Sequence, residues 1–294
     1  MRRRAHIGLP AATAVALLVA YSMVFFYAPT DEDQGFVQKI FYLHVPLAIV
    51  TLGGLIAAAA MAAMYLRSGK REWDARSYVA VHVSLILGVA GLLTGSIWAK
   101  ASWGHWWVWQ EPTLVSYLII LLLFCCYQPL RFAIEDPERQ SRYAAVFAVT
   151  GGAFIPVNFV AVRLAAAYTH PRVFQLGGAQ LPAAMGLTFV VALVAIALLF
   201  VTMCRFELHA KKVRGRVRAL ERRAAALLDE GAAPPRRRAA FPDAAPRMPL
   251  PEPSAAATHA VAAHSAAAHP AAAHPSAAHP SAAHPAAAIP IRSN

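Results

Sequence analysis

The chain is poor in charged residues and in cysteine for its length of 294 residues. Charged residues make up 14% of the sequence, whereas about 25% is usual in a soluble domain. The three cysteines form neither a C-x-x-C-H motif nor a zinc-binding spacing, which excludes covalent haem attachment of the c-type cytochrome kind. A P-loop of the form G-x-x-x-x-G-K-S/T is also missing, so any ATP hydrolysis must come from another chain.

Long hydrophobic runs are abundant instead. Hydrophobic residues make up 58% of the chain, and about 20 apolar residues suffice for a helix to cross the hydrocarbon core of a bilayer. Because lipid cannot satisfy backbone hydrogen bonds, we expect an all-α, polytopic membrane bundle of six transmembrane helices. The expected spans are Leu9–Tyr27, Ile40–Leu66, Tyr78–Ala99, Thr113–Leu130, Tyr143–Leu164 and Ala183–Cys204.

The start of the chain also resembles a secretory signal peptide, since "MRRR" precedes an apolar run. The segment that follows the run, "FFYAPTDEDQ", is bulky and then acidic and has no convincing small-x-small cleavage pattern. We therefore favour a first helix that is retained in the membrane.

Basic residues alternate between the segments that connect the spans. They gather before the first span, between the second and third, between the fourth and fifth, and after the sixth. This positive-inside pattern predicts that both termini are cytoplasmic and that the protein is a multi-pass protein of the plasma (inner) membrane. No basic stretch is interleaved with base-stacking aromatics, so nucleic acid is not an expected partner.

The chain after the sixth span differs in composition from the spans. We divide the sequence into a membrane domain (1–205), a basic cytoplasmic helix on the anionic leaflet (206–231) and a disordered Ala/Pro/His-rich tail (232–294). Histidine recurs every five residues from His259 to His284, and the prolines forbid a regular helix there. Loose metal capture by these imidazoles is the alternative interpretation.

Four of the six tryptophans stand within seven positions, in "WGHWWVWQEP" at residues 103–112. This segment follows the third span and is predicted to lie outside the membrane on the extracytoplasmic side. On a helical reading Trp103, Trp106 and Trp107 share one face, so we expect a short outer tryptophan-rich helix or loop. The alternative is an ordinary aromatic belt at the membrane interface.

Two histidines are predicted to lie on the same outer side as the tryptophans. His44 begins the second span in "QKIFYLHVP", and His170 follows the fifth span in "AAAYTHPR". Neutral imidazoles are good axial ligands for haem iron, and indole rings suit an apolar porphyrin. These residues predict an outer haem site, although each histidine could instead be an ordinary polar interface residue.

The haem propionates would need cations on the outer side. The available residues are Lys39, Lys100, Arg163 and Arg172. The alternative role of these side chains is snorkelling to the membrane surface.

Three separated motifs carry a resemblance to a known family. "QKIFYLHVP", "WGHWWVW" with an acidic residue after it, and "IPVNFVAVRLAAAYTHP" occur in this order. Over residues 10–205 the chain resembles cytochrome c maturation protein C, also called haem exporter protein C, a branch of the tryptophan-rich haem-handling membrane proteins. The resemblance implies haem b held by His44 and His170, and a loop of Trp103, Gly104, Trp106, Trp107 and Trp109 that cradles the porphyrin.

The resemblance also implies partners and a role. The partners are a membrane-anchored haem chaperone and the ATPase and membrane subunits of an ABC transporter complex. The role is haem delivery in cytochrome c biogenesis, with no catalytic residues. The family pattern ends its tryptophan signature with Asp and a basic residue, whereas this chain has Gln110, Glu111, Pro112 and Thr113. We expect Glu111 to serve as the missing carboxylate.

Three other classes stay open at this point. A b-type cytochrome subunit for electron transfer would need ligands on facing helices, and His82 is the candidate inside a span. A haem–cytochrome c synthetase-like component would normally call for more helices. A structural or channel subunit is the third.

Overall fold

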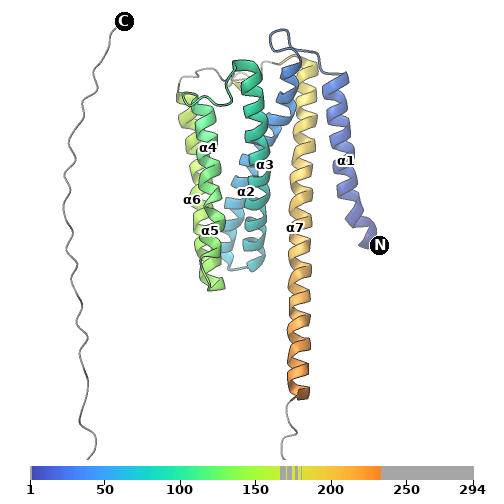
Figure 1. The fold of residues 1–294 in the computed structure, drawn as a ribbon, viewed down its shortest axis with the longest axis vertical. Coiled ribbons are helices and arrows are strands. Elements are labelled where there is room, and N and C mark those ends of the chain that lie inside the picture. Colours follow the sequence, from blue (N-terminus) through green and yellow to red (C-terminus); the bar gives the residue numbers. More distant parts are fainter. Residues whose placement is uncertain (1, 166–169, 171–173, 176–177, 180, 233–294) are drawn as a thin grey trace, which may run out of the picture. The chain divides into compact units, whose positions relative to one another are not determined.

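The computed structural model describes residues 2–165, 170, 174–175, 178–179 and 181–232. Within this part of the chain, six helices are long and apolar enough to cross a membrane, which confirms the predicted all-α bundle (Figure 1). The elements are α1 (Arg2–Phe26), a 3-10 turn (Phe36–Ile40), α2 (Phe41–Ser68), α3 (Arg71–Trp103), α4 (Pro112–Cys125), α5 (Tyr127–Phe132), α6 (Pro137–Leu164), β1 (Phe174–Gln175), β2 (Gly178–Ala179) and α7 (Ala183–Ala232).

Helix α2 is the central element of the bundle, because it packs against α3, α6 and α7. It ends at Ser68, and the left-handed φ of 65° at its C-cap, Gly69, lets the chain turn directly into α3. The two helices approach closely where their side chains are small. A Cβ added at Gly54 would lie 2.3 Å from Oγ of Ser84, so this α2–α3 contact requires glycine.

Helix α2 contributes to three buried hydrophobic clusters. One joins α2 to α3, α4, α5 and α6 around Leu55, Phe124 and Tyr127. A second joins α1, α2 and α7 around Tyr42 and Phe189. A third joins α2, α3 and α7 around Leu47, Leu87 and Ile196.

The outer tryptophan segment forms a loop, which is one of the two forms that the sequence predicted, and not a short helix. Helix α3 ends at Trp103, and Gly104 caps it with φ of 78° while its N–H donates to the Lys100 carbonyl over 3.1 Å. The segment that follows has no helix until Pro112, where Glu111 caps α4. Gly104 ends the helix before Trp106 and Trp107, so the helical face that these indoles would share does not form.

The last helix is longer than the predicted span. Helix α7 runs without a break over 50 residues, from Ala183 to Ala232, so residues 206–231 continue the sixth membrane helix. Residues 233–294, which include the histidine repeat, lie outside the described residues. The connection between α6 and α7 contains β1 and β2, which form a two-residue antiparallel pair.

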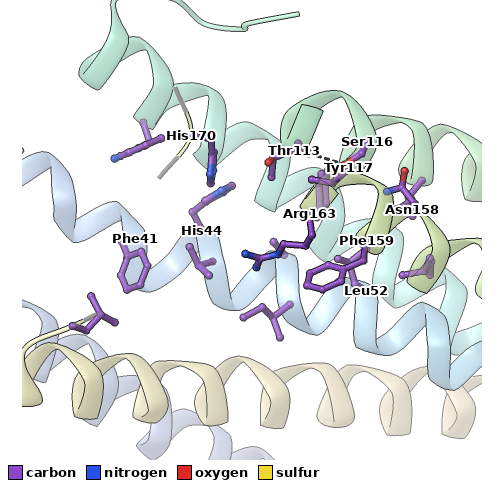
Figure 2. A pocket seen from close by; sticks show the side chains of 18 of the residues that line it. Phe41, His44, Leu52, Thr113, Ser116, Tyr117, Asn158, Phe159, Arg163 and His170 are labelled. Carbon is purple, nitrogen blue, oxygen red and sulfur yellow. Dashed lines mark hydrogen bonds between the residues drawn. The ribbon is translucent and has the colours of Figure 1, made fainter. Parts of the chain in front are cut away.

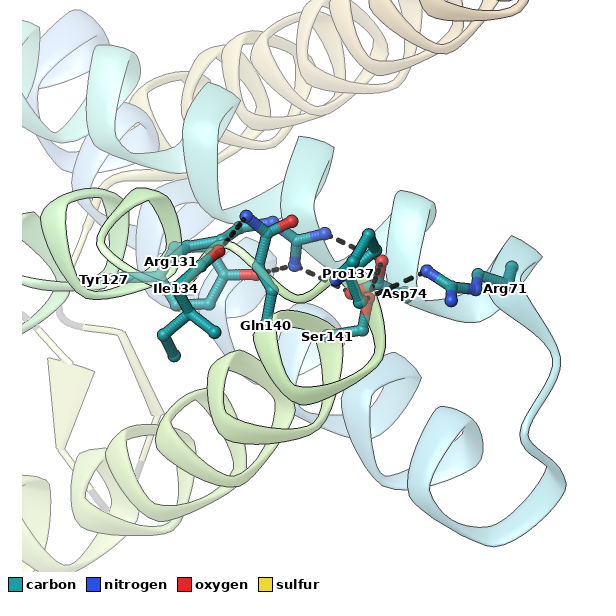
Figure 3. A network of polar contacts seen from close by, with 8 residues as sticks. All are labelled: Arg71, Asp74, Tyr127, Arg131, Ile134, Pro137, Gln140 and Ser141. Atoms are coloured by element: carbon teal, nitrogen blue, oxygen red, sulfur yellow. Dashed lines mark hydrogen bonds and ion pairs between the residues drawn. The ribbon is translucent and has the colours of Figure 1, made fainter. Parts of the chain in front are cut away.

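A buried ion pair ties three helices together (Figure 3). Two guanidinium nitrogens of Arg131 on α5 each donate to one carboxylate oxygen of Asp74 on α3, over 2.7 Å. Ser141 on α6 donates to the same carboxylate over 3.1 Å, and Arg131 also donates to the Tyr127 hydroxyl. This network fixes the N-terminal end of α3 against α5 and α6.

Candidate functional site

A pocket of about 690 Å³ opens between α2, α4, α6 and α7. His44 from α2 and His170 from the connection after α6 both line it. Figure 2 shows the two histidines at one end of the pocket, with Leu52 farther along α2. The structure thus brings together the two histidines that the sequence predicted to act as a pair.

The ring of His44 is held by α3. Its Nδ1 lies 2.9 Å from the carbonyl oxygen of Gly91. A carbonyl can only accept a hydrogen bond, so Nδ1 carries the proton and the neutral ring keeps its lone pair on Nε2. Gly95 makes room for the ring, because a Cβ there would lie 2.5 Å from Cε1 of His44. The α3 backbone therefore fixes both the position and the tautomer of this imidazole.

His170 is held by two tryptophans. Its ring meets the edges or faces of Trp98 and Trp103 with centroids 5.9 and 6.0 Å apart, and the two indoles themselves pack edge-to-face at 4.8 Å. The indole N–H of Trp98 donates to Gln34 over 3.0 Å, which anchors the cluster to the loop before α2. Two rings from α3 and the His170 ring therefore meet at this end of the pocket.

Glu111 connects His170 to the start of α4. One carboxylate oxygen accepts from the backbone N–H of His170 over 3.0 Å, and the other accepts from the N–H of Thr113 over 3.3 Å. The side chain is completely buried. Glu111 therefore acts both as the N-cap of α4 and as the anchor of the His170 segment.

The four clustered tryptophans occupy different environments. Trp103 contacts His170, whereas Trp106 and Trp109 are 60% and 69% exposed. Trp107 packs edge-to-face against Trp109 at 5.8 Å. Among the described residues that line the pocket, Trp98 is the one tryptophan, and none of these four is included.

Trp98 was not among the predicted site residues, because it lies outside the tryptophan-rich segment at residues 103–112. The available signal was its position near the outer end of the third span, five residues before Trp103.

The four residues predicted to bind the haem propionates also lie in different environments. Lys39 is buried and donates to the carbonyls of Ala28 and Pro29 over 2.6 and 3.2 Å, beside the end of α1. Lys100 donates to the Gly104 carbonyl over 2.8 Å. Arg163 lines the pocket, with its guanidinium 5.0 Å from the Phe159 ring centroid. Arg172 lies outside the described residues.

His82, the candidate ligand inside a span, has a different partner. Its Nδ1 lies 2.9 Å from a carboxylate oxygen of Glu207 on α7. It is not among the described residues that line the pocket.

Comparisons with known proteins identify the family. Residues 2–223 match the family CcmC, described as Heme exporter protein C. The relative named Heme exporter protein C from Bradyrhizobium diazoefficiens is 30% identical over 217 residues, which are 72% of this chain and 81% of the relative. The Escherichia coli K12 relative of the same name is 32% identical over 149 residues, or 51% of this chain and 60% of the relative. The resemblance inferred from the three motifs is thus confirmed, and the chain belongs to the Heme exporter protein C family.

Proposed function

We propose that this protein binds haem b at the extracytoplasmic face of the membrane and presents it to a membrane-anchored haem chaperone. Membership of the Heme exporter protein C family implies a role in haem delivery for cytochrome c maturation. The ATPase and membrane subunits of an ABC transporter are the further partners in this proposal. Haem is the cargo, and the chain is a delivery component that makes no covalent bond itself.

The observation that carries the proposal is the shared pocket of His44 and His170. The chemistry of the pocket suits an apolar tetrapyrrole with an iron at its centre. Its volume of about 690 Å³ lies within the range of about 300–1,000 Å³ that is usual for small-molecule and cofactor sites. The Nε2 lone pair of His44 is the type of donor that haem iron takes as an axial ligand.

The residues around the histidines support the same assignment. Hydrogen bonding of the second ring nitrogen to a backbone carbonyl is the usual way in which proteins orient a metal-binding histidine, and His44 has this bond. Arg163 at the pocket is a cation that suits an anionic propionate. We assign His44 and His170 as the axial ligands and Arg163 as a propionate partner.

The exposed tryptophans suit a protein that passes haem to a partner rather than one that stores it. Trp106 and Trp109 present large aromatic surface at the same end of the bundle as His170. Exposed indoles of this size are typical of residues that dominate binding interfaces. We assign them to contact with the haem chaperone, while Trp103 keeps His170 in place.

The test of the haem site is a visible spectrum of the purified protein with and without added haem. We expect a Soret band and α/β bands typical of two histidine ligands, and their loss in His44→Ala and in His170→Ala. His82→Ala is the matched control, because its ring pairs with Glu207 and should leave the spectrum unchanged. Loss of haem only in His82→Ala would favour a b-type cytochrome instead.

The test of presentation separates binding from transfer. Trp106→Ala and Trp109→Ala should retain the haem spectrum but capture less of the haem chaperone in a pull-down of the haem-loaded protein. Trp103→Ala should weaken haem binding itself, because this ring contacts His170. Unchanged chaperone capture by the Trp106 and Trp109 variants would contradict their assignment.

A further inference from the structure

Part of the pocket wall is exposed at membrane depth. Ile49 and Ile56 on α2 line the pocket, yet they are 40% and 46% exposed. Together with Val45 and Leu52, which also line it, they form a stripe with the spacing of one helix face. A side chain that lines a pocket and is also exposed marks the place where the pocket opens to its surroundings.

The stripe begins at the predicted haem ligand and continues into the membrane. Ile49 follows His44 by five residues and Ile56 follows it by twelve, which correspond to about 7.5 and 18 Å along a helix. The hydrocarbon core is about 30 Å thick. The opening therefore extends from the site to roughly the middle of the bilayer, where the surroundings are lipid and not water.

The helices on either side of the stripe leave it uncovered. Phe159 and Val162 on α6 line one wall of the pocket, and Leu181 and Met185 line the other, at the start of α7. Both helices pack against α2, but they form no extensive interface with each other among the described residues. The pocket is therefore a groove with α2 as its floor, and it is open sideways along α2.

We propose that this groove is a lateral entrance through which haem reaches His44 and His170 from within the bilayer. The inference rests on the proposed function, since it names the source of the same cargo. An apolar disc that has partitioned into lipid can pass between α6 and α7 without entering water. Its iron then meets imidazoles at the outer end of the groove.

The outer end of the groove favours haem over an acyl chain as its occupant. It has the two histidines and Arg163, which suit an iron and a carboxylate, whereas a lipid tail needs neither.

The experiment compares haem in the bilayer with haem in water. The full-length protein, free of haem, is reconstituted into vesicles that already contain haem, and the bis-histidine spectrum is followed with time. A water-soluble haem-binding protein is added in excess outside and inside the vesicles as a scavenger. We expect the initial rate of loading to be unchanged by the scavenger, because the cargo never leaves the membrane.

Variants test whether the groove is the entrance. Ile49→Trp fills the groove beside His44, so loading should be about tenfold slower, which corresponds to about 1.4 kcal/mol on the barrier. Val160→Trp is the matched control, since Val160 is 55% exposed on α6 but is not a lining residue of the pocket.

The outcomes distinguish this inference from the proposed function. Loading that the scavenger abolishes would overturn lateral entry, and so would equal rates for wild type, Ile49→Trp and Val160→Trp. The scavenger comparison uses the wild-type chain, so it stays decisive if the Ile49→Trp protein does not fold. A wild-type chain that never develops the bis-histidine spectrum, from vesicles or from added haem, would overturn the proposed function itself.

Discussion

His44 and His170 are held in place by different kinds of contact. The backbone of α3 fixes His44 through the Gly91 carbonyl and the space at Gly95. His170 stands in a loop and depends on side chains, namely Glu111 and the two indoles that meet its ring. If both are ligands, as we propose, the one on a rigid helix and the one on a loop should respond differently to substitutions in their surroundings.

Glu111→Ala tests the loop-borne ligand. The substitution removes the N-cap of α4, which should cost about 1 kcal/mol of stability. It also removes the acceptor for the His170 N–H, so haem affinity should fall about 10–100-fold, the usual effect of losing a group that orients a metal ligand. Thermal unfolding and a haem titration measure the two effects, and Glu111→Gln should recover part of each.

Asp136→Ala is the matched control for this prediction. Asp136 caps α6 by accepting from the Arg139 N–H over 2.7 Å, so its loss should cost a similar amount of stability. It makes no contact with His170, and haem affinity should stay at the wild-type value. Equal haem affinity in Glu111→Ala and Asp136→Ala would show that Glu111 is only a helix cap.

Gly95→Ala tests the ligand on the helix. Replacing glycine by alanine inside a helix normally stabilises it by about 0.5–1 kcal/mol. Here the new methyl group would lie 2.5 Å from the His44 ring, so the ring must move away from Gly91. Haem affinity should therefore fall about 10–100-fold, as measured by titration of the Soret band.

Gly53→Ala provides the comparison for Gly95→Ala. Gly53 lies on α2, which packs against α3, and a Cβ added there would meet nothing within 4 Å. This variant should gain helix stability with no change in haem binding. If both alanine variants bind haem as the wild type does, the ring of His44 has another way to adjust and its tight fit is unimportant.

The sequence was informative about the proposed haem ligands and less informative about the residues that hold them in place. His44 and His170 could be predicted as a pair because span topology places them on one side of the membrane. Glu111 was expected as a carboxylate of the site, but its contact with His170 depends on how two loops meet. Lys39 and Lys100 were expected to meet propionates, yet both donate to carbonyls of nearby loops. A sequence does not show which backbone groups are left without partners.

At the scale of elements, the spans were predictable because apolar length alone determines them. For the tryptophan segment the sequence predicted a helix or a loop, and the loop forms because the left-handed Gly104 ends α3 before the indoles can continue its helical spacing. The fourth predicted span is divided into α4 and α5 around Cys126. Residues 206–231 were expected to form a separate basic helix, because the composition changes there. The backbone instead continues as one helix, and α7 extends to Ala232.

Arg131→Ala tests what holds the helices together at the end remote from the histidines. The substitution leaves the buried Asp74 carboxylate without its bidentate partner, which should destabilise the protein by about 3–5 kcal/mol. Asp74 precedes Gly95 by 21 residues on α3, or about 30 Å, so the fraction that stays folded should keep its haem spectrum. Thermal unfolding in detergent and a haem titration measure both.

Arg76→Ala is the corresponding surface variant. Its guanidinium lies 3.8 Å from Glu72 on the same helix, and both side chains are largely exposed. Such a pair contributes about 0–1 kcal/mol, so unfolding should change little. If Arg131→Ala unfolds no more easily than Arg76→Ala, the Asp74 network does not hold α3, α5 and α6 together.

For the whole molecule, the order of the described helices determines which parts of the site lie at the same membrane surface. Six spans connected in sequence bring the starts of α2 and α4 and the end of α3 to one end of the bundle, and the turn at Gly69 to the other (Figure 1). The site and the exposed Trp106 and Trp109 therefore belong to one membrane face. Which face it is depends on the charges of the connections.

The positive-inside rule makes a prediction about this face that is independent of haem. Basic residues Arg67, Lys70 and Arg71 surround the α2–α3 turn, whereas the α3–α4 loop has none between Lys100 and Pro112, so the loop should be extracytoplasmic. In a chain whose native cysteines are replaced by serine, Gln110→Cys should react with a membrane-impermeant maleimide on intact spheroplasts. Ser68→Cys, at the end of α2, should react only after the membrane is permeabilised. The opposite pattern would place His44 and His170 on the cytoplasmic side, where delivery to an extracytoplasmic chaperone is impossible, although haem binding itself would be unaffected.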